Sequence, residues 1–136
     1  MIGLIFGLLA QTVSLEQPDP VATAPTAEWL VGVWLLSADR GDLNRSACNS
    51  GTTLTYLADG TTNAWGETGQ WSLVGDELTE TLTEVLPDTG DPDRLPMVGK
   101  QITQQLVRVG PDEGVLVDDT GARIPMLRCR ANDFAQ

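Results

Sequence analysis

The amino-acid sequence predicts an all-β protein, a small up-and-down antiparallel β-barrel of about eight strands with a short N-terminal helical turn. Short runs of β-forming residues recur from Val33 onward, and turn signals such as Asp59-Gly60 and Gly75-Asp76 separate them. No segment keeps a long helical period. Because a chain of many short strands must pair or cover its strand edges, we expect the sheet to close on itself.

The N-terminal part is expected to lie outside the barrel. Residues 1–10 form an apolar run that is too short to cross a bilayer, which takes about 20 apolar residues, but that has the length of the apolar region of a signal peptide. We predict a signal peptide over residues 1–14, a proline-containing flexible linker over residues 15–26, and a periplasmic or secreted location. No membrane span is expected in the mature chain. The alternative, that the apolar run belongs to the core, is disfavoured because the linker detaches it.

Residues 27–136 are predicted to form the barrel domain. Thr26 is a suitable N-cap for a helical turn that leads into Gly32. A Pro- and Asp-rich excursion over residues 86–96 separates the fifth predicted strand from the sixth. The predicted strands run over residues 33–37, 52–58, 61–67, 69–74, 77–85, 100–109, 114–119 and 122–131.

The fifth predicted strand has a helical alternative over residues 77–86. Its apolar residues at positions 78, 82, 85 and 86 fit one face of a helix, and Asp76 could cap it. Threonines at positions 79, 81 and 83 favour a strand instead, and the Gly-Asp pair before them is typical of a hairpin turn. We therefore predict a strand.

The two cysteines are Cys48 and Cys129. They lie far apart with no Cys-x-x-Cys spacing, so neither a zinc site nor thioredoxin-like chemistry is indicated. An even cysteine count in an exported chain predicts a disulfide. A disulfide that closes a loop of this length should stabilise the fold by about 4 to 5 kcal/mol at most, because it lowers the conformational entropy of the unfolded chain.

The charge balance excludes several classes of partner. Eight basic residues against 19 acidic ones give a formal net charge of −11, which repels nucleic acid and anionic lipid. The charge either attracts a basic partner protein or only keeps the chain soluble. The chain has no histidine, so it lacks the commonest general base and the commonest metal ligand.

No candidate catalytic or metal site emerges from the residues. Asp88, Asp91 and Asp93 lack the full calcium-loop pattern and are expected to be solvated loop carboxylates, as is the pair Asp118-Asp119. The serines at positions 46, 50 and 72 have no histidine partner and no Gly-x-Ser-x-Gly context. The carboxylates at positions 80 and 84 are expected on the outer face of a strand. We predict a protein that is not an enzyme and needs no cofactor or metal.

Gly32-Val33-Trp34, after a short helical turn, resembles the Gly-x-Trp element that opens the first strand of lipocalins and related calycins. The resemblance implies that Trp34 closes the narrow end of the barrel and that an arginine near the end of the last strand, Arg128 or Arg130, lies across it. We expect Trp29 to cap the outside of that end. A guanidinium over an indole contributes roughly 0.5 to 2 kcal/mol.

Two further resemblances concern function. Residues 56–79 are similar to the pattern of small bacterial lipocalin-like secreted proteins, in which Asp-Gly leads to Gly-x-Trp and a Gly-Asp turn. Residues 14–18 and 27–37, followed by Cys48, resemble the opening of bacterial secreted metalloprotease inhibitors, whose free N-terminal segment enters the protease cleft. The cysteine spacing differs from that second family, in which the disulfide closes a short loop.

The aromatic residues Tyr56, Trp65 and Trp71 either line a pocket for a small apolar ligand or pack as ordinary core. Glu80 and Gln104 interrupt apolar faces and could be polar contacts inside a cavity. We expect a non-catalytic extracytoplasmic barrel that binds a small hydrophobic ligand or has a structural role at the envelope. The alternative is a secreted protease inhibitor that acts through its N-terminal arm, and a weaker option is an acidic module for a basic protein.

Overall fold

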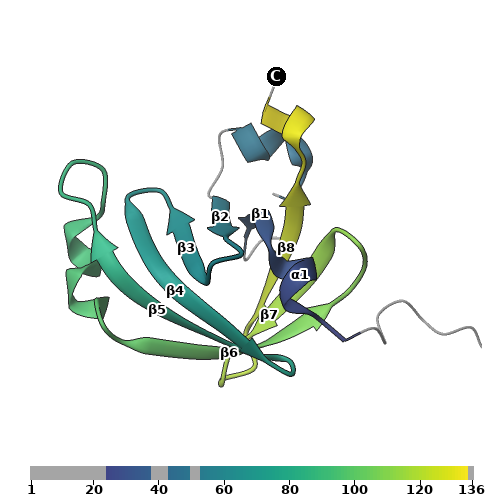
Figure 1. Ribbon diagram of the computed structural model, residues 1–136. Coiled ribbons are helices and arrows are strands. Elements are labelled where there is room, and N and C mark those ends of the chain that lie inside the picture. The colour runs from purple at the N-terminus through teal and green to yellow at the C-terminus, as the bar shows by residue number, and fades with distance from the viewer. Residues whose placement is uncertain (1–23, 38–42, 50–52, 135–136) are drawn as a thin grey trace, which may run out of the picture.

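The computed structural model describes residues 24–37, 43–49 and 53–134, and it confirms the predicted closed β-barrel (Figure 1). Eight antiparallel strands follow one another around the barrel in chain order, and β1 pairs with both β2 and β8. The predicted signal peptide and residues 15–23 of the predicted linker lie outside the described residues. Among the described residues, no helix is long and apolar enough to cross a membrane.

The elements occur close to their predicted positions. The strands are β1 (Gly32–Leu36), β2 (Thr53–Tyr56), β3 (Thr61–Ala64), β4 (Glu67–Val74), β5 (Glu77–Val85), β6 (Gln101–Arg108), β7 (Glu113–Val117) and β8 (Arg123–Cys129). One α-helical turn, α1 (Ala27–Leu30), precedes them, and three 3₁₀ segments accompany them: η4 (Arg45–Asn49), η5 (Pro92–Met97) and η6 (Ala131–Phe134).

Local signals explain where several elements begin and end. Thr26 caps α1, because its hydroxyl accepts a hydrogen bond from the Trp29 backbone N–H at 3.1 Å. Asp59 and Gly60 form the predicted turn between β2 and β3, where the Asp59 carboxylate accepts from the Thr61 backbone at 3.0 Å. The segment with the helical alternative is strand β5, as predicted.

One predicted strand was too long. The run over residues 61–67 breaks after Ala64, and Trp65 and Gly66 form the turn that leads into β4. Gly66 has a φ of +74°, and a Cβ atom there would lie 2.5 Å from the Cα of Gly90. Only glycine fits this close approach, so the chain turns there instead of continuing as a strand.

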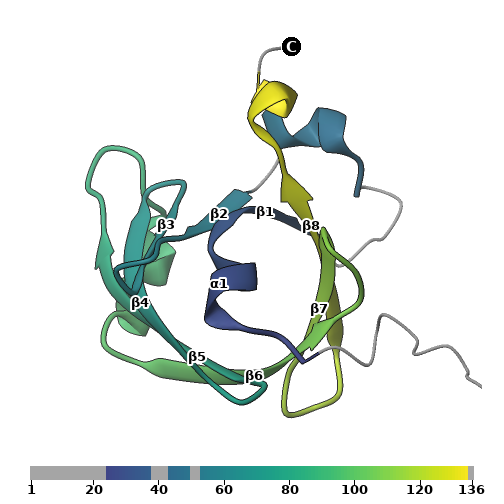
Figure 2. The same ribbon diagram turned by 45° about the vertical axis from the view of Figure 1, so that its right-hand side comes forward.

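The strands are of unequal length, which makes one side of the barrel longer than the other. β4, β5 and β6 have eight, nine and eight residues, whereas β1, β2, β3 and β7 have four or five. The long side carries η5 at one end of the barrel (Figure 1). The helical turn α1 lies within the ring of strands when the barrel is viewed along its length (Figure 2).

The apolar side chains form two clusters on opposite faces of the sheet. The larger cluster fills the barrel, and its fully buried members are Leu30, Trp34, Tyr56, Leu78, Leu106 and Met126. The smaller cluster lies outside the barrel and contains Leu35, Cys48 and Cys129. Cys48 and Cys129 form the predicted disulfide, with their Cα atoms 5.9 Å apart. This bond ties η4 to the end of β8.

Candidate functional site

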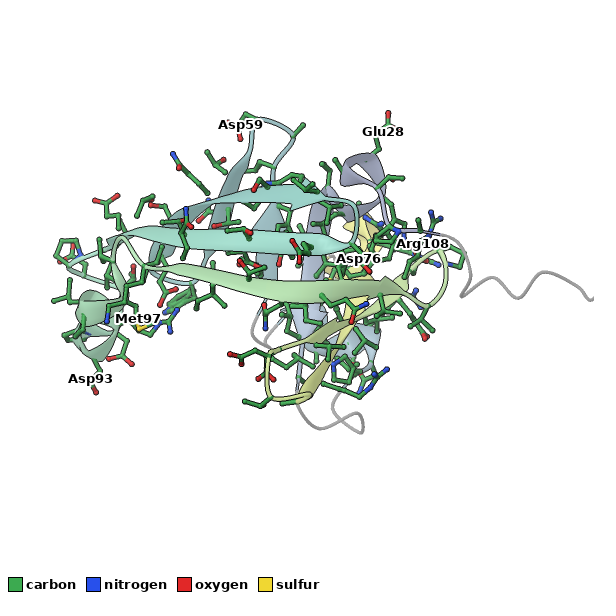
Figure 3. All side chains as sticks on the ribbon, turned by 90° about the horizontal axis from the view of Figure 1, so that it is seen from below. Glu28, Asp59, Asp76, Asp93, Met97 and Arg108 are labelled. Atoms are coloured by element: carbon green, nitrogen blue, oxygen red, sulfur yellow. A yellow bond between two sulfur atoms is a disulfide. The ribbon has the colours of Figure 1, made fainter. Side chains whose placement is uncertain are left out.

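The two ends of the barrel differ in chemistry. We call the end that holds α1 the closed end and the end that carries η5 the open end. Figure 3 shows Arg108 and Met97 at opposite ends of the barrel. Arg108 lies over the ring of Trp29, a residue of α1, at the closed end, and Met97 belongs to η5 at the open end.

At the closed end, Trp34 is fully buried and Arg128 lies over its ring. The two residues face each other as register partners on β1 and β8, and the guanidinium carbon is 4.4 Å from the indole centroid. Arg128 Nη1 donates to the Val31 carbonyl at 3.0 Å, and Nη2 donates to the Trp29 carbonyl. Arg128 therefore stacks on the indole and also satisfies carbonyls at the end of α1.

Trp29 does not cap the outside of this end, as the sequence suggested, but lies within it. It is only 7% exposed, and its ring meets that of Trp34 edge to face, with centroids 5.0 Å apart. Its indole N–H donates to the Pro111 carbonyl at 3.0 Å. Seen along the barrel, α1 lies across the ring of strands (Figure 2), with Trp29 and Leu30 packed on the core and Glu28 exposed. Both tryptophans therefore close this end of the barrel.

Gly32 gives Arg128 the room it needs. Its φ is +143°, a conformation that L side chains rarely adopt, and a Cβ atom at this position would lie 2.7 Å from Arg128 Nη1. The Gly-x-Trp spacing therefore has a local cause: the glycine admits the guanidinium, and the tryptophan two residues later receives it.

Arg130 lies on the outer side of the closed end. It forms an ion pair with Asp112, which also pairs with Arg45 at 3.3 Å and with Arg128 Nε at 3.3 Å. The hydrogen bond from Arg130, together with the positive charges of all three arginines, lowers the pKa of the Asp112 carboxyl. Asp112 thus links the half-buried Arg128 to Arg45 and to the exposed Arg130.

At the open end, a cavity of about 220 Å³ lies between the barrel interior and η5. It is smaller than the roughly 300 Å³ at the lower end of typical ligand sites. Six apolar side chains, four threonines and four charged side chains line it: Leu36, Leu54, Ala64, Leu82, Met97, Ile102, Thr53, Thr62, Thr68, Thr81, Glu67, Glu80, Arg94 and Lys100.

Glu80 points into this cavity and is held by Tyr56. The Tyr56 hydroxyl donates to Glu80 Oε2 at 2.7 Å, and burial raises the pKa of the Glu80 carboxyl. Burial, with the nearby Glu80 charge as a second cause, also raises the pKa of Tyr56. The expectation that Glu80 lies on the outer face was wrong, because Glu80 shares the inward face of β5 with Leu78 and Leu82.

None of the three aromatic residues predicted to line the pocket borders the cavity. Tyr56 and Trp71 pack edge to face with centroids 5.8 Å apart, and they fill the barrel beneath the cavity. Trp65 is 81% exposed at the turn between β3 and β4, so its prediction as an interior residue was wrong. Gln104 is half-buried but does not line the cavity either.

The mouth of the cavity carries two cations with different partners. Arg94, from η5, pairs with both carboxylate oxygens of Glu67, at 2.8 and 3.3 Å. The side chain of Lys100, just before β6, makes no ion pair or hydrogen bond with any residue in the described ranges, while its backbone N–H donates to the Met97 carbonyl at 3.0 Å. An ammonium group is therefore available at the opening.

Sequence reasoning missed Glu67, Arg94 and Lys100 as cavity residues. Arg94 and Lys100 belong to or follow the irregular excursion, where no periodicity indicates which way a side chain points. For Glu80 the sequence does hold a signal: in a strand, positions 78, 80 and 82 share one face, and Leu78 and Leu82 indicate that this face points inward.

The loop aspartates have roles in turns. Asp91 caps η5 by accepting from the Asp93 backbone at 2.9 Å, and Asp118 accepts from the Thr120 and Ala122 backbones at 2.9 Å each. Within residues 24–37, 43–49 and 53–134, no three acidic or cysteine side chains gather where they could hold a metal ion.

Comparison with known proteins returned no match to any protein-family model, to any curated protein or to any solved structure. The lipocalin-like resemblance is therefore supported at the level of the eight-stranded antiparallel barrel alone.

Proposed function

We propose that the protein is a non-catalytic, lipocalin-like extracytoplasmic barrel that binds a small, mostly apolar molecule in the cavity at its open end. The observation that carries this proposal is a largely apolar cavity of about 220 Å³ that contains a half-buried carboxyl, Glu80, fixed by Tyr56. Ligand sites commonly combine apolar walls with a few polar groups that set the ligand's orientation.

The size of the cavity limits the ligand. At about 30 Å³ per group, the volume that a water molecule occupies in the liquid, 220 Å³ holds roughly seven non-hydrogen groups. Glu80 offers a hydrogen bond in the depth of the cavity, and Lys100 offers a cation at the opening. A short amphipathic molecule, with its apolar part inside and an acidic or hydroxyl end near Lys100, fits both features.

The disulfide between Cys48 and Cys129 supports a location outside the cytoplasm, since such bonds persist in oxidising compartments. The alternative of protease inhibition depends on the N-terminal arm, most of which lies outside the described residues, so it stays a prediction from the sequence.

The proposal can be tested by calorimetric titration with a series of short fatty acids and the matching alcohols. Leu82→Trp should fill the cavity and abolish binding, because Leu82 lines it. Leu95→Trp is the matched control, since Leu95 is 54% exposed on η5 and does not line the cavity. Failure of every ligand to bind the wild type, or equal binding by both variants, would contradict the proposal.

A further inference from the structure

A second concave surface lies on the outside of the barrel, and we call it the outer groove. It is an open groove of about 820 Å³ between the β3–β4 turn and the segment formed by η4 and η6. Thr55 and Asn63, register partners on β2 and β3, lie along it. Trp65 stands on one side, and Cys48 and Phe134 stand on the other.

Both sides of the outer groove are held in place. The Trp65 side is fixed because the Gly66 carbonyl accepts from the Leu86 backbone at 2.8 Å and Gly66 packs closely on Gly90. The opposite side is fixed by the disulfide, which ties η4 to the strand end just before η6. η4 and η6 lie side by side at the same end of the molecule (Figures 1 and 2). The groove is thus a preformed feature of the surface.

The aromatic residues of the outer groove are unusually available. Trp65 is 81% exposed and makes no aromatic, cation–π or hydrogen-bond contact with other described residues. Phe134 is 42% exposed. A surface tryptophan on a rigid turn presents a large flat ring at low entropic cost, which makes it a natural contact for a ligand with an apolar face.

The polar residues of the outer groove define the chemistry of that ligand. Asn63, Thr55 and Thr89 have side chains without hydrogen-bond partners among the described residues. Hydroxyl and amide groups both donate and accept hydrogen bonds, as do the hydroxyl groups of sugars. The described lining residues carry no charge, although the protein as a whole has a net charge of −11. An uncharged ligand therefore matches this groove, whereas a basic ligand would favour the acidic residues elsewhere in the chain.

We infer that the outer groove binds an uncharged oligosaccharide, with one sugar ring stacked on Trp65 and its hydroxyls bonded to Asn63 and the neighbouring threonines. The C–H face of a pyranose ring carries partial positive charge and packs on the electron-rich face of an indole. Sugars whose hydroxyls are all equatorial expose the flattest such face, so β-1,4-linked glucose and N-acetylglucosamine chains fit best. The site is separate from the cavity at the open end.

The test is titration of the full chain with cellohexaose and with N-acetylchitohexaose, followed by calorimetry and by tryptophan fluorescence. At least one of them should bind saturably, and the emission of the exposed Trp65 should shift. Trp65→Ala should weaken binding by roughly tenfold or more, and Trp65→Phe should weaken it less because a ring is kept. Val74→Ala is the matched control, since Val74 is 75% exposed at the other end of β4.

Three results would overturn the inference. The first is no saturable binding of either oligosaccharide. The second is binding that Trp65→Ala leaves unchanged. The third is a concentration-dependent dimer in sedimentation that Trp65→Ala abolishes while sugars fail to bind, which would make the groove a protein interface. A hexamer of galacturonic acid should bind more weakly than the neutral chains, because its carboxylates meet a protein of net charge −11.

Discussion

The closed end and the open end of the barrel use their charged residues in opposite ways. At the closed end, Arg128 is covered by an indole and satisfied by backbone carbonyls and by Asp112. At the open end, Glu80 is half-buried beside a cavity and bonded to Tyr56, and the Lys100 side chain has no partner among the described residues. A charge whose bonding is complete supports packing, whereas one with spare bonding capacity next to empty volume is available to a ligand. The well-packed arginine and the proposed binding cavity thus lie at different ends of the barrel.

The largest effect is expected at Trp34. Trp34→Ala should lower the free energy of unfolding by about 3 to 5 kcal/mol, because it opens a cavity in the closed end and removes the ring beneath Arg128. Trp65→Ala, the same change at an 81% exposed position, should stay within about 0.5 kcal/mol of wild type. Urea unfolding of both variants measures the difference, and similar losses would mean that Trp34 does not close the barrel as described.

A smaller effect is expected at Gly32. Gly32→Ala should lower the free energy of unfolding by about 2 to 3 kcal/mol. The φ of +143° is unfavourable for alanine, and the new Cβ atom would lie 2.7 Å from Arg128 Nη1. Gly75→Ala separates the two causes, since Gly75 has a φ of +62° but open space around it. This substitution should lower the free energy of unfolding by only about 1 kcal/mol. Denaturant midpoints for the pair provide the measurement. An equal cost at both positions would show that the close approach to Arg128 is unimportant.

The smallest effect is a difference in pH dependence between two carboxyls. The pKa of Glu80 is raised in the folded state, so its contribution to stability is full below its unfolded pKa and is lost as pH rises through the folded value. Glu80→Gln should therefore stabilise the protein at neutral pH and lose that advantage in acid. The pKa of Asp112 is lowered, so its contribution is present above its unfolded pKa and is lost as pH falls through the folded value.

Asp112→Asn should accordingly destabilise the protein at neutral pH, with the difference from wild type closing in acid. Each difference should be on the order of 1 kcal/mol. Thermal melts of both variants and wild type between pH 3 and about pH 8 would record the opposite trends, over the range where carboxyls titrate. Parallel trends in the two variants would contradict the assignment of opposite environments to the two ends.

The sequence was sufficient for most of the fold because its signals are local. Period-two alternation and glycine-containing turns mark strands wherever they occur, and Thr26 marks the start of α1. The disulfide was also predictable, because the chain has two cysteines without metal-site or redox-motif spacing, and the sequence predicts export.

The candidate sites were harder to predict, because they depend on which way single side chains point and on a segment that is neither helix nor strand. The sequence around Trp65 has the pattern of a strand. The chain turns there because Gly66 packs closely on Gly90, which is distant in sequence, and Trp65 is left exposed. Trp29 faces inward because α1 covers the end of the barrel and packs Trp29 and Leu30 onto its core, which no local pattern encodes. Arg94 and Lys100 reach the cavity from a segment without periodicity.

The position of the disulfide has a consequence for damage to the chain. Seven of the eight strands, β2 to β8, lie between Cys48 and Cys129 or end at Cys129. A protease that cuts once anywhere between these cysteines, for example in the exposed segment around η5, leaves two fragments that are still joined covalently. Such a nicked molecule differs from the intact one only by one added water until it is reduced. Because the disulfide keeps the two fragments at a high effective concentration, their strands stay paired.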